Sequence, residues 1–271
     1  MRFAICNEIY KGWSLPDTFR HARAAGYDAV EIAPFTLAKS VGLIPPARRA
    51  EIRQQAADAG VALSAIHWVL VETEGLHVTS PDPVVRARTA RYFVDLVDFG
   101  ADLGAPCMVV GSPKQRNLLP GVTNEQGWAW AADVFRPAVA RARDRGFTIC
   151  FEPLAPSETN FINTARDARR FADLFASPAM SIILDVKAMS SEGRPVAETI
   201  RQSGGRFAYF HANDANLKGP GFGDVDFVPI ARALRDVGYD GTVSVEVFRF
   251  EEGPEAIATR SRASLREAFG C

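Results

Sequence analysis

Short apolar runs alternate with longer amphipathic segments along the whole chain. Eight runs have the composition of buried strands: RFAIC (2–6), DAVEIAP (28–34), VALSAIHW (61–68), CMVVGSP (107–113), FTICFEPL (147–154), MSIILDVK (180–187), FAYFHAN (207–213) and TVSVEVF (242–248). Segments with helical spacing lie between them, such as PARRAEIRQQAADAG and PDPVVRARTARYFVDLVDFGADLG. Several of these helices are expected to end at a glycine, because glycine tolerates the left-handed backbone of a helix C-cap. The glycines in question are Gly26, Gly60, Gly104, Gly146 and Gly238.

This alternation predicts an α/β fold with a parallel sheet. Strands that are apolar along their whole length are buried on both faces, and consecutive parallel strands need crossover connections. Eight such units in 271 residues fit one closed (β/α)₈ TIM barrel, since these barrels take roughly 250 residues. An open doubly wound sheet is the alternative, but it usually has fewer strands, and no GxGxxG follows the first strand. We therefore expect residues 1–271 to form a single TIM-barrel domain.

Charge and cysteine content narrow the choice of partners and environment. The chain has 31 basic and 32 acidic residues, a net charge of −1, and no block of like charge, so we expect neither a nucleic acid nor a membrane surface as a partner. The four cysteines lie far apart and form no CxxC pair, which predicts no disulfide framework. The first residues, MRFAICNEIY, lack the apolar core of a signal peptide. These features favour a cytoplasmic protein.

Four of the predicted strands carry an ionisable side chain near their C-terminal ends. Glu152 lies in ICFEPL, Asp185 in IILDVK, His211 in YFHAND and Glu246 in SVEVF. Neighbouring barrel strands end at one mouth, so three carboxylates and one imidazole would meet there. Taken singly, each residue is as well explained by a cap, an ion pair or core packing. Together they indicate a divalent metal, because a cation removes the repulsion between carboxylates; the ligand set favours Mn²⁺, with Mg²⁺, Co²⁺ and Zn²⁺ as alternatives.

On these motifs the chain resembles the sugar phosphate isomerase/epimerase superfamily of xylose isomerase-like TIM barrels. The likeness covers essentially the whole chain and is most specific over residues 147–248, where ICFEPL, IILDVK, FHANDAN and VSVEVF are similar to the strand motifs of ketose 3-epimerases. PGFGDVDF resembles the segment that links the seventh strand to its helix in that family. The resemblance implies that Glu152, Asp185, His211 and Glu246 bind the metal, and that Glu152 and Glu246 are also the acid/base pair. It also implies a homodimer or homotetramer.

Two positions at which the family carries substrate-binding residues differ in this chain. Epimerases typically carry a His three residues after the sixth-strand Asp, where this chain has Ala188, and often an Arg six residues after the seventh-strand His, where it has Leu217. Strand side chains alternate with period two, so Lys187 is predicted to share the face of Asp185 in the strand MSIILDVK. We predict that Lys187 acts at the mouth as a cationic electrophile or proton donor. The alternative is a salt bridge to Glu152 or Asp185.

Further residues are predicted to contact the substrate, each with a structural alternative. They are Glu158, His67, Trp68, Arg116 and Asn213. Glu158 matches a family position that contacts substrate hydroxyls, although a helix cap explains it equally well. Trp68 can stack on a sugar ring or pack in the core, and Arg116 can bind a polar substrate or face solvent. Glu31, in VEIAP, is expected at the mouth as a partner of the ligands.

Two enzyme functions fit this site. The first is a divalent-metal-dependent isomerase or epimerase of a keto-sugar or small polyhydroxy ketone, which transfers a proton through a metal-stabilised enediolate. The alternative is a metal-dependent lyase or dehydratase of a keto-sugar or keto-glycoside, which expels a β-leaving group from the same kind of enolate. A nuclease of the endonuclease-IV type needs several histidine ligands, and the chain has only four histidines. A sugar-binding protein without turnover is less consistent with the intact Glu152/Glu246 pair.

Overall fold

The structure, a computed structural model of residues 1–271, contains a closed barrel of eight parallel strands in the order β1 to β8. The strands are β1 (Arg2–Cys6), β2 (Ala29–Ile32), β3 (Ala62–Ile66), β4 (Cys107–Val110), β5 (Thr148–Phe151), β6 (Met180–Asp185), β7 (Tyr209–Ala212) and β8 (Thr242–Val245). Pairing of β1 with β8 closes the ring, for example through Phe3 and Val243. Every strand lies inside a range predicted from the sequence, and the predicted (β/α)₈ barrel is confirmed.

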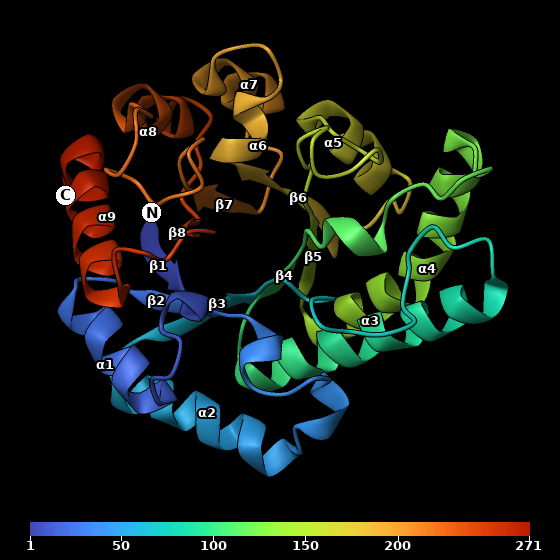
Figure 1. Ribbon diagram of the computed structural model, residues 1–271, viewed down its shortest axis with the longest axis horizontal. Coiled ribbons are helices and arrows are strands. Elements are labelled where there is room, and N and C mark those ends of the chain that lie inside the picture. The colour runs from blue at the N-terminus through green and yellow to red at the C-terminus, as the bar shows by residue number, and fades with distance from the viewer.

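Helices surround the strands (Figure 1). They are α1 (Leu15–Ala24), α2 (Pro46–Asp58), α3 (Pro83–Leu103), α4 (Asn124–Arg145), α5 (Ala165–Asp173), α6 (Val186–Ser190), α7 (Val196–Ser203), α8 (Phe227–Asp236) and α9 (Pro254–Phe269). Their ends follow local chemistry. Thr123 and Gln126 form a capping box at the start of α4, and Gly146, with φ of 61°, ends that helix in the left-handed conformation that favours glycine.

Apolar side chains fill two regions. A cluster of 67 buried residues includes the contacts between the barrel and its helices. A smaller cluster occupies inward-facing positions of the strands and consists of Ala65, Cys107, Val109, Cys150, Ile183 and Tyr209. The four cysteines are free, and three of them are buried. None of the helices combines the length and apolar character that crossing a bilayer requires.

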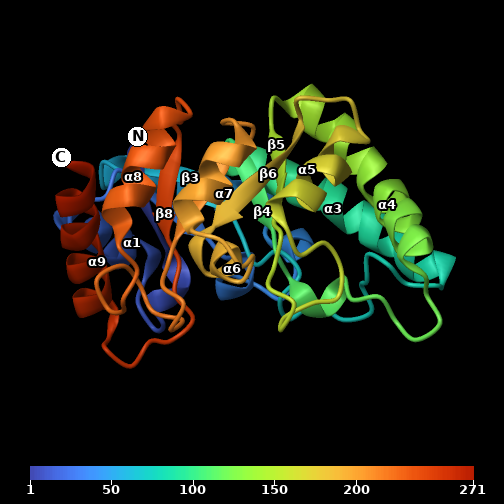
Figure 2. The ribbon, with the colours of Figure 1, turned by 90° about the horizontal axis from the view of Figure 1, so that it is seen from above.

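The loops that follow the strands gather at one end of the barrel. Figure 2 shows α6 and the loops that lead into α5, α8 and α9 along the lower edge of the molecule, away from the N-terminus. The side chains at the C-terminal ends of the strands point to this end, since parallel strands all finish on the same side of a barrel. Functional residues are therefore expected here.

Candidate active site

The structure brings together the four ionisable residues at the ends of β5 to β8. Glu152 directly follows β5, Asp185 ends β6, His211 lies in β7, and Glu246 directly follows β8. Asp185 and His211 are paired in register, so their side chains leave the barrel wall at the same level. The potential ligand atoms of all four residues lie within 4.8 Å of one another, and all four residues are buried.

This cluster fits a cation on chemical grounds. Burial together with the nearby Glu152 charge raises the pKa of Asp185 to about 7, and burial also raises the pKa of Glu152. Burial and the charge of a neighbouring carboxylate both disfavour the charged forms of Glu152 and Asp185. His211 Nδ1 lies 3.1 Å from Glu246 Oε2 and 3.8 Å from Glu152 Oε1 but makes no hydrogen bond. A divalent ion would neutralise the carboxylates and occupy the free nitrogen.

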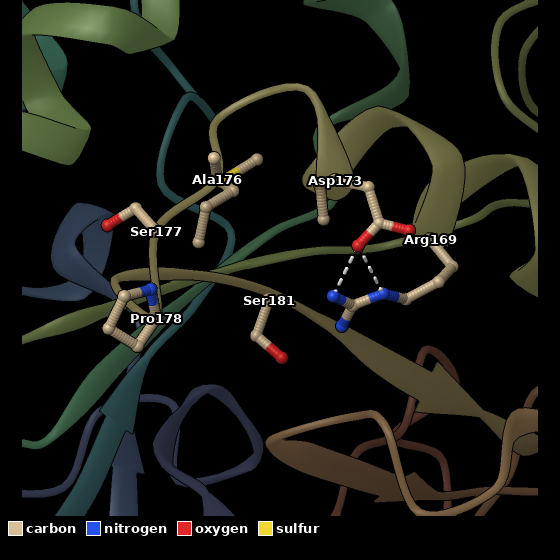
Figure 3. Close-up of a pocket in the computed structure, with 8 residues that line it drawn as sticks. Arg169, Asp173, Ala176, Ser177, Pro178 and Ser181 are labelled. Carbon is tan, nitrogen blue, oxygen red and sulfur yellow. Dashed lines mark hydrogen bonds and ion pairs between the residues drawn. The ribbon is translucent and has the colours of Figure 1, made fainter.

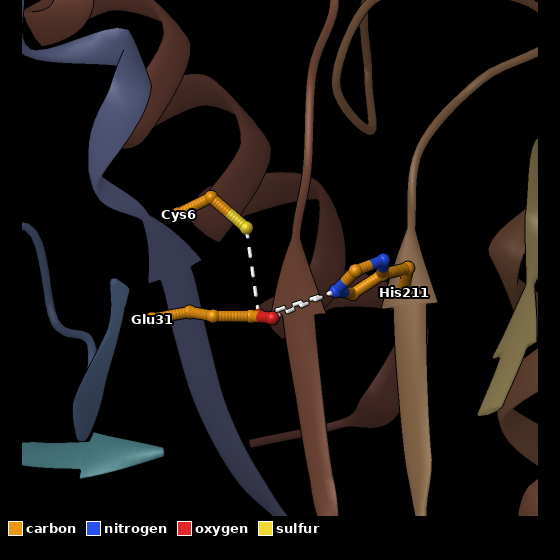
Figure 4. Close-up of side chains that lie close together, drawn as sticks. All are labelled: Cys6, Glu31 and His211. Carbon is orange, nitrogen blue, oxygen red and sulfur yellow. Dashed lines mark hydrogen bonds and ion pairs between the residues drawn. The ribbon is translucent and has the colours of Figure 1, made fainter. Parts of the chain in front are cut away.

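Glu31, on β2, holds the other nitrogen of the same imidazole. His211 Nε2 lies 3.2 Å from both Glu31 oxygens, and Tyr209 donates a hydrogen bond of 3.0 Å to Glu31 Oε2. Cys6 approaches the same carboxylate from β1 at 3.5 Å, as Figure 4 shows. Burial opposes the Glu31 charge, but the imidazoles of His211 and His67 lower the pKa of Glu31 to about 2. An anionic Glu31 keeps the proton on Nε2, which leaves the Nδ1 lone pair for a metal.

A cavity of about 490 Å³ opens above this cluster. Glu152 and Glu246 form part of its wall, so both reach the space where a substrate would lie. Lys187 and Glu158 line it as well, and Lys187 Nζ lies 2.8 Å from Glu158 Oε1. The ammonium group also sits 3.9 Å from the ring centroid of Phe248. The cavity therefore offers a donor and an acceptor for hydroxyl groups beside an apolar ring.

Three of the predicted substrate contacts lie outside the cavity. His67 is buried against Glu8, at 3.0 Å, and Glu31, at 3.6 Å. Asn213 donates to the Asp185 carboxylate and accepts a hydrogen bond of 2.8 Å from the Lys187 backbone. Both residues therefore contact the strand-end residues or Glu31 rather than line the cavity.

Arg116, the third of these residues, is fully buried. Its guanidinium donates to the backbone oxygens of Glu152 at 2.6 Å and Ile162 at 3.2 Å, and it lies 4.8 Å from the Phe151 ring centroid. It thus fastens the end of β5 and the loop that follows. The predicted contact between Arg116 and a substrate is replaced by this structural role.

Lys187 reaches the cavity by a different route from the predicted one. β6 ends at Asp185, and Lys187 lies in the short helix α6. Asp185 caps this helix, since its Oδ1 accepts a hydrogen bond of 2.7 Å from the Ala188 backbone. The salt-bridge partner of Lys187 is Glu158, not Glu152 or Asp185.

Several residues that shape the site were not predicted from the sequence. Gly111, Ser112 and Phe248 line the cavity, and Glu8 holds His67. Glu8 follows the first strand by two residues, so the rule that found the other strand-end carboxylates could have found it. Phe248 lies two residues after Glu246, in the loop that follows β8.

A second hollow, of about 330 Å³, lies between the C-terminal end of α5 and the first residues of β6 (Figure 3). Its charged groups are already paired, since Arg169 Nε donates a hydrogen bond of 3.0 Å to Asp173. It contains none of the four ionisable residues at the C-terminal ends of β5 to β8. We therefore place the candidate site in the cavity at the barrel mouth.

Comparison with known proteins identifies the family of this chain. The family model described as xylose isomerase-like TIM barrel matches residues 19–268. A D-psicose 3-epimerase from Ruminiclostridium cellulolyticum is 26% identical over 225 residues, which are 82% of this chain and 74% of that protein. A ketose 3-epimerase from Arthrobacter globiformis is 29% identical over 231 residues, 83% of this chain and 75% of that protein. A crystal structure of D-psicose 3-epimerase in the presence of D-fructose aligns over 100% of both chains with a TM-score of 0.86 and 22% identity, which shows a shared fold.

Proposed function

This chain belongs to the xylose isomerase-like TIM barrel family, and from that premise we propose that it is a divalent-metal-dependent epimerase or isomerase of a keto-sugar or small polyhydroxy ketone. Relatives named as ketose and psicose 3-epimerases support a sugar isomerase or epimerase. The observation that carries the proposal is the pair of carboxylates, Glu152 and Glu246, that faces one cavity from the ends of two strands.

The metal would be held by Glu152, Asp185, His211 and Glu246, whose ligand atoms lie within 4.8 Å of one another. Three carboxylates and one imidazole suit Mn²⁺, and Mg²⁺, Co²⁺ or Zn²⁺ can take the same ligands. A bound cation supplies positive charge beside the substrate oxygens on which negative charge develops. Glu31 contributes by fixing the proton on His211 Nε2, at 3.2 Å.

The two carboxylates would move the proton. In the proposed reaction, one of Glu152 and Glu246 removes the proton from the carbon beside the substrate carbonyl, and the other returns a proton from the opposite face. Lys187 and Glu158, joined at 2.8 Å, would bind and orient the substrate hydroxyls. The buried position of both glutamates limits access of water to the reacting carbon.

The proposal is tested with a metal-replete preparation and a panel of ketoses and 3-keto-glycosides in D₂O. We expect deuterium uptake at carbon without loss of water or an aglycone. Glu246→Gln should abolish exchange and yet leave some metal bound. Glu251→Gln is the matched control, because Glu251 is an exposed neighbour paired with Arg249 at 2.7 Å, and it should leave exchange unchanged.

Two results would redirect the assignment. Release of an aglycone or water in step with deuterium uptake would favour the lyase or dehydratase alternative. Exchange that survives Glu246→Gln would show that the acid/base assignment is incorrect.

A further inference from the structure

Trp68 has a left-handed backbone conformation, which is uncommon for a residue other than glycine. It follows His67, whose backbone N–H still bonds to Ile32 at 3.0 Å in the strand ladder. At Trp68 the chain turns sharply, with φ of 52°. This left-handed region is unfavourable for any residue that has a Cβ, and such strain commonly accompanies a functional constraint.

Two aromatic rings stack on the Trp68 indole. The Phe35 ring stacks on it with 5.8 Å between centroids and an interplanar angle of 17°. The Phe248 ring stacks on the indole at 5.8 Å and 27°. These neighbours occupy indole surface that stacking on a sugar ring would need, although Trp68 lines the cavity.

The edge of the indole ring carries the informative contact. Trp68 Nε1–H donates a hydrogen bond of 2.7 Å to Glu246 Oε1. The other oxygen, Oε2, faces the metal-ligand cluster, at 3.1 Å from His211 Nδ1 and 3.4 Å from Asn213 Nδ2. The two oxygens of Glu246 therefore have different surroundings. Oε2 faces His211, and Oε1 accepts the hydrogen bond from the indole.

Glu152 has no comparable restraint. Its nearest nitrogen partner is His211 Nδ1, at 3.8 Å from Oε1, and its Oε2 packs against Gly111. The two members of the acid/base pair therefore differ, because a protein donor fixes only Glu246. A charged acceptor makes this hydrogen bond stronger than one between neutral groups.

We propose that Trp68 is a positioning residue, which fixes the Oε1 oxygen of Glu246 for proton transfer and does not bind the substrate by stacking. This inference rests on the proposed function for its kinetic consequence, but the contact itself does not. The Phe35 and Phe248 rings and the left-handed backbone together aim the indole N–H at the carboxylate. Fixing a reacting group in this way raises the rate of the chemical step, because less freedom is lost on reaching the transition state.

The contact is tested by NMR without any turnover. Protein labelled with ¹⁵N at its four tryptophans gives four indole N–H signals, and the one lost in Trp68→Phe belongs to Trp68. We expect this signal at low field, as a hydrogen bond to a carboxylate requires, and expect it to move upfield in Glu246→Ala while the Trp128 signal stays in place. A Trp68 signal that is the same in wild type and Glu246→Ala would overturn the proposal.

The role is tested by kinetics. Trp68→Phe keeps an aromatic ring beside Phe35 and Phe248 but lacks the N–H, so we expect kcat to fall about 10- to 100-fold while KM and the Mn²⁺ dissociation constant change less than about threefold. Trp128→Phe, the same substitution beside Phe171 on the outer wall, should change none of them. An unchanged kcat, or a rise in KM alone, would refute the positioning role. If none of the tested substrates takes up deuterium in the presence of the wild-type protein, the proposed function fails. The NMR result still decides whether Trp68 contacts Glu246.

Discussion

At the residue scale, a glycine determines where the Glu152 carboxylate can lie. Gly111 follows β4, and a Cβ at this position would lie 2.3 Å from Glu152 Oε2, which is closer than two unbonded atoms can approach. Its φ is outside the left-handed region, so alanine brings no backbone strain. A side chain introduced at position 111 would therefore affect the site by displacing Glu152.

We predict that Gly111→Ala displaces Glu152 and weakens Mn²⁺ binding about 10- to 100-fold, by analogy with the loss of groups that orient metal ligands. Calorimetric titration of the chelated protein measures this change, and the circular dichroism spectrum should remain that of the wild type. Gly42→Ala is the matched control, since its nearest neighbour, Ser40 Oγ, would lie 3.7 Å away in ordinary contact. Full Mn²⁺ affinity in Gly111→Ala would contradict the assignment of Glu152 as a ligand.

The sequence predicted which strand-end side chains meet, but it did not predict what the loop residues contact. Glu152, Asp185, His211 and Glu246 converge because parallel strands end at one level, a rule that needs no knowledge of loop paths. Arg116 lies in a loop, and its burial against backbone oxygens of Glu152 and Ile162 depends on how two loops cross. No periodicity encodes such a crossing.

At the scale of elements, ion pairs join α2, α3 and α4 on the outer wall. Asp102 accepts a hydrogen bond of 2.7 Å from Arg145 and one of 3.0 Å from Arg49. Arg141 donates to Asp98 at 2.8 Å. Burial alone would raise the pKa of Asp102, but the two arginines outweigh it and lower the pKa below its ordinary value of 3.8. The folded state therefore favours the charged form of Asp102.

We predict that Asp102→Asn lowers the free energy of unfolding by about 0.5 to 1 kcal/mol at neutral pH, the range of a partly exposed network. A lowered folded-state pKa contributes stability that is complete above the unfolded value of 3.8 and is lost as the pH falls through the folded-state pKa. Urea unfolding of both proteins should therefore give curves that converge at acid pH. Asp133→Asn, which removes an exposed pair 3.6 Å long, should show no difference at any pH.

The sequence located the strands better than the short helices. Eight apolar runs gave eight strands because apolar length and flanking turn residues define a buried parallel strand. The pattern of MSIILDVK predicts one strand and no helix, but only Met180–Asp185 is extended, and α6 follows it. Asp185 is both the last strand residue and the N-cap of α6, so the strand signal and the helix signal overlap at one residue. The prediction that Lys187 shares the strand face of Asp185 required the strand to continue beyond Asp185, and it ends there.

At the scale of the whole molecule, barrel closure joins the two ends of the chain. β1 pairs with β8, and Tyr27 donates a hydrogen bond of 2.9 Å to the backbone of Ala258, 231 residues away. The main buried cluster contains 67 residues drawn from all parts of the sequence. Such long-range contacts mean that no segment buries its apolar face alone, which is the physical basis for expecting residues 1–271 to form a single domain.

Binding of a metal ion should raise the unfolding temperature of this single domain. If the chain is one domain and the four ligands bind a divalent ion, calorimetry should show one unfolding transition that moves to higher temperature when Mn²⁺ is added to chelated protein. A free Mn²⁺ concentration of about 100 times Kd adds about 2.7 kcal/mol, which raises the Tm of a chain of this size by about 5 to 10 °C. Asp185→Asn should lose most of this rise, while its side chain can still cap α6 as Asp185 does through Oδ1. Two separate transitions would contradict the single domain, and a Tm that is indifferent to Mn²⁺, Mg²⁺, Co²⁺ and Zn²⁺ would contradict the metal site, since any ion that binds only the folded state must stabilise it.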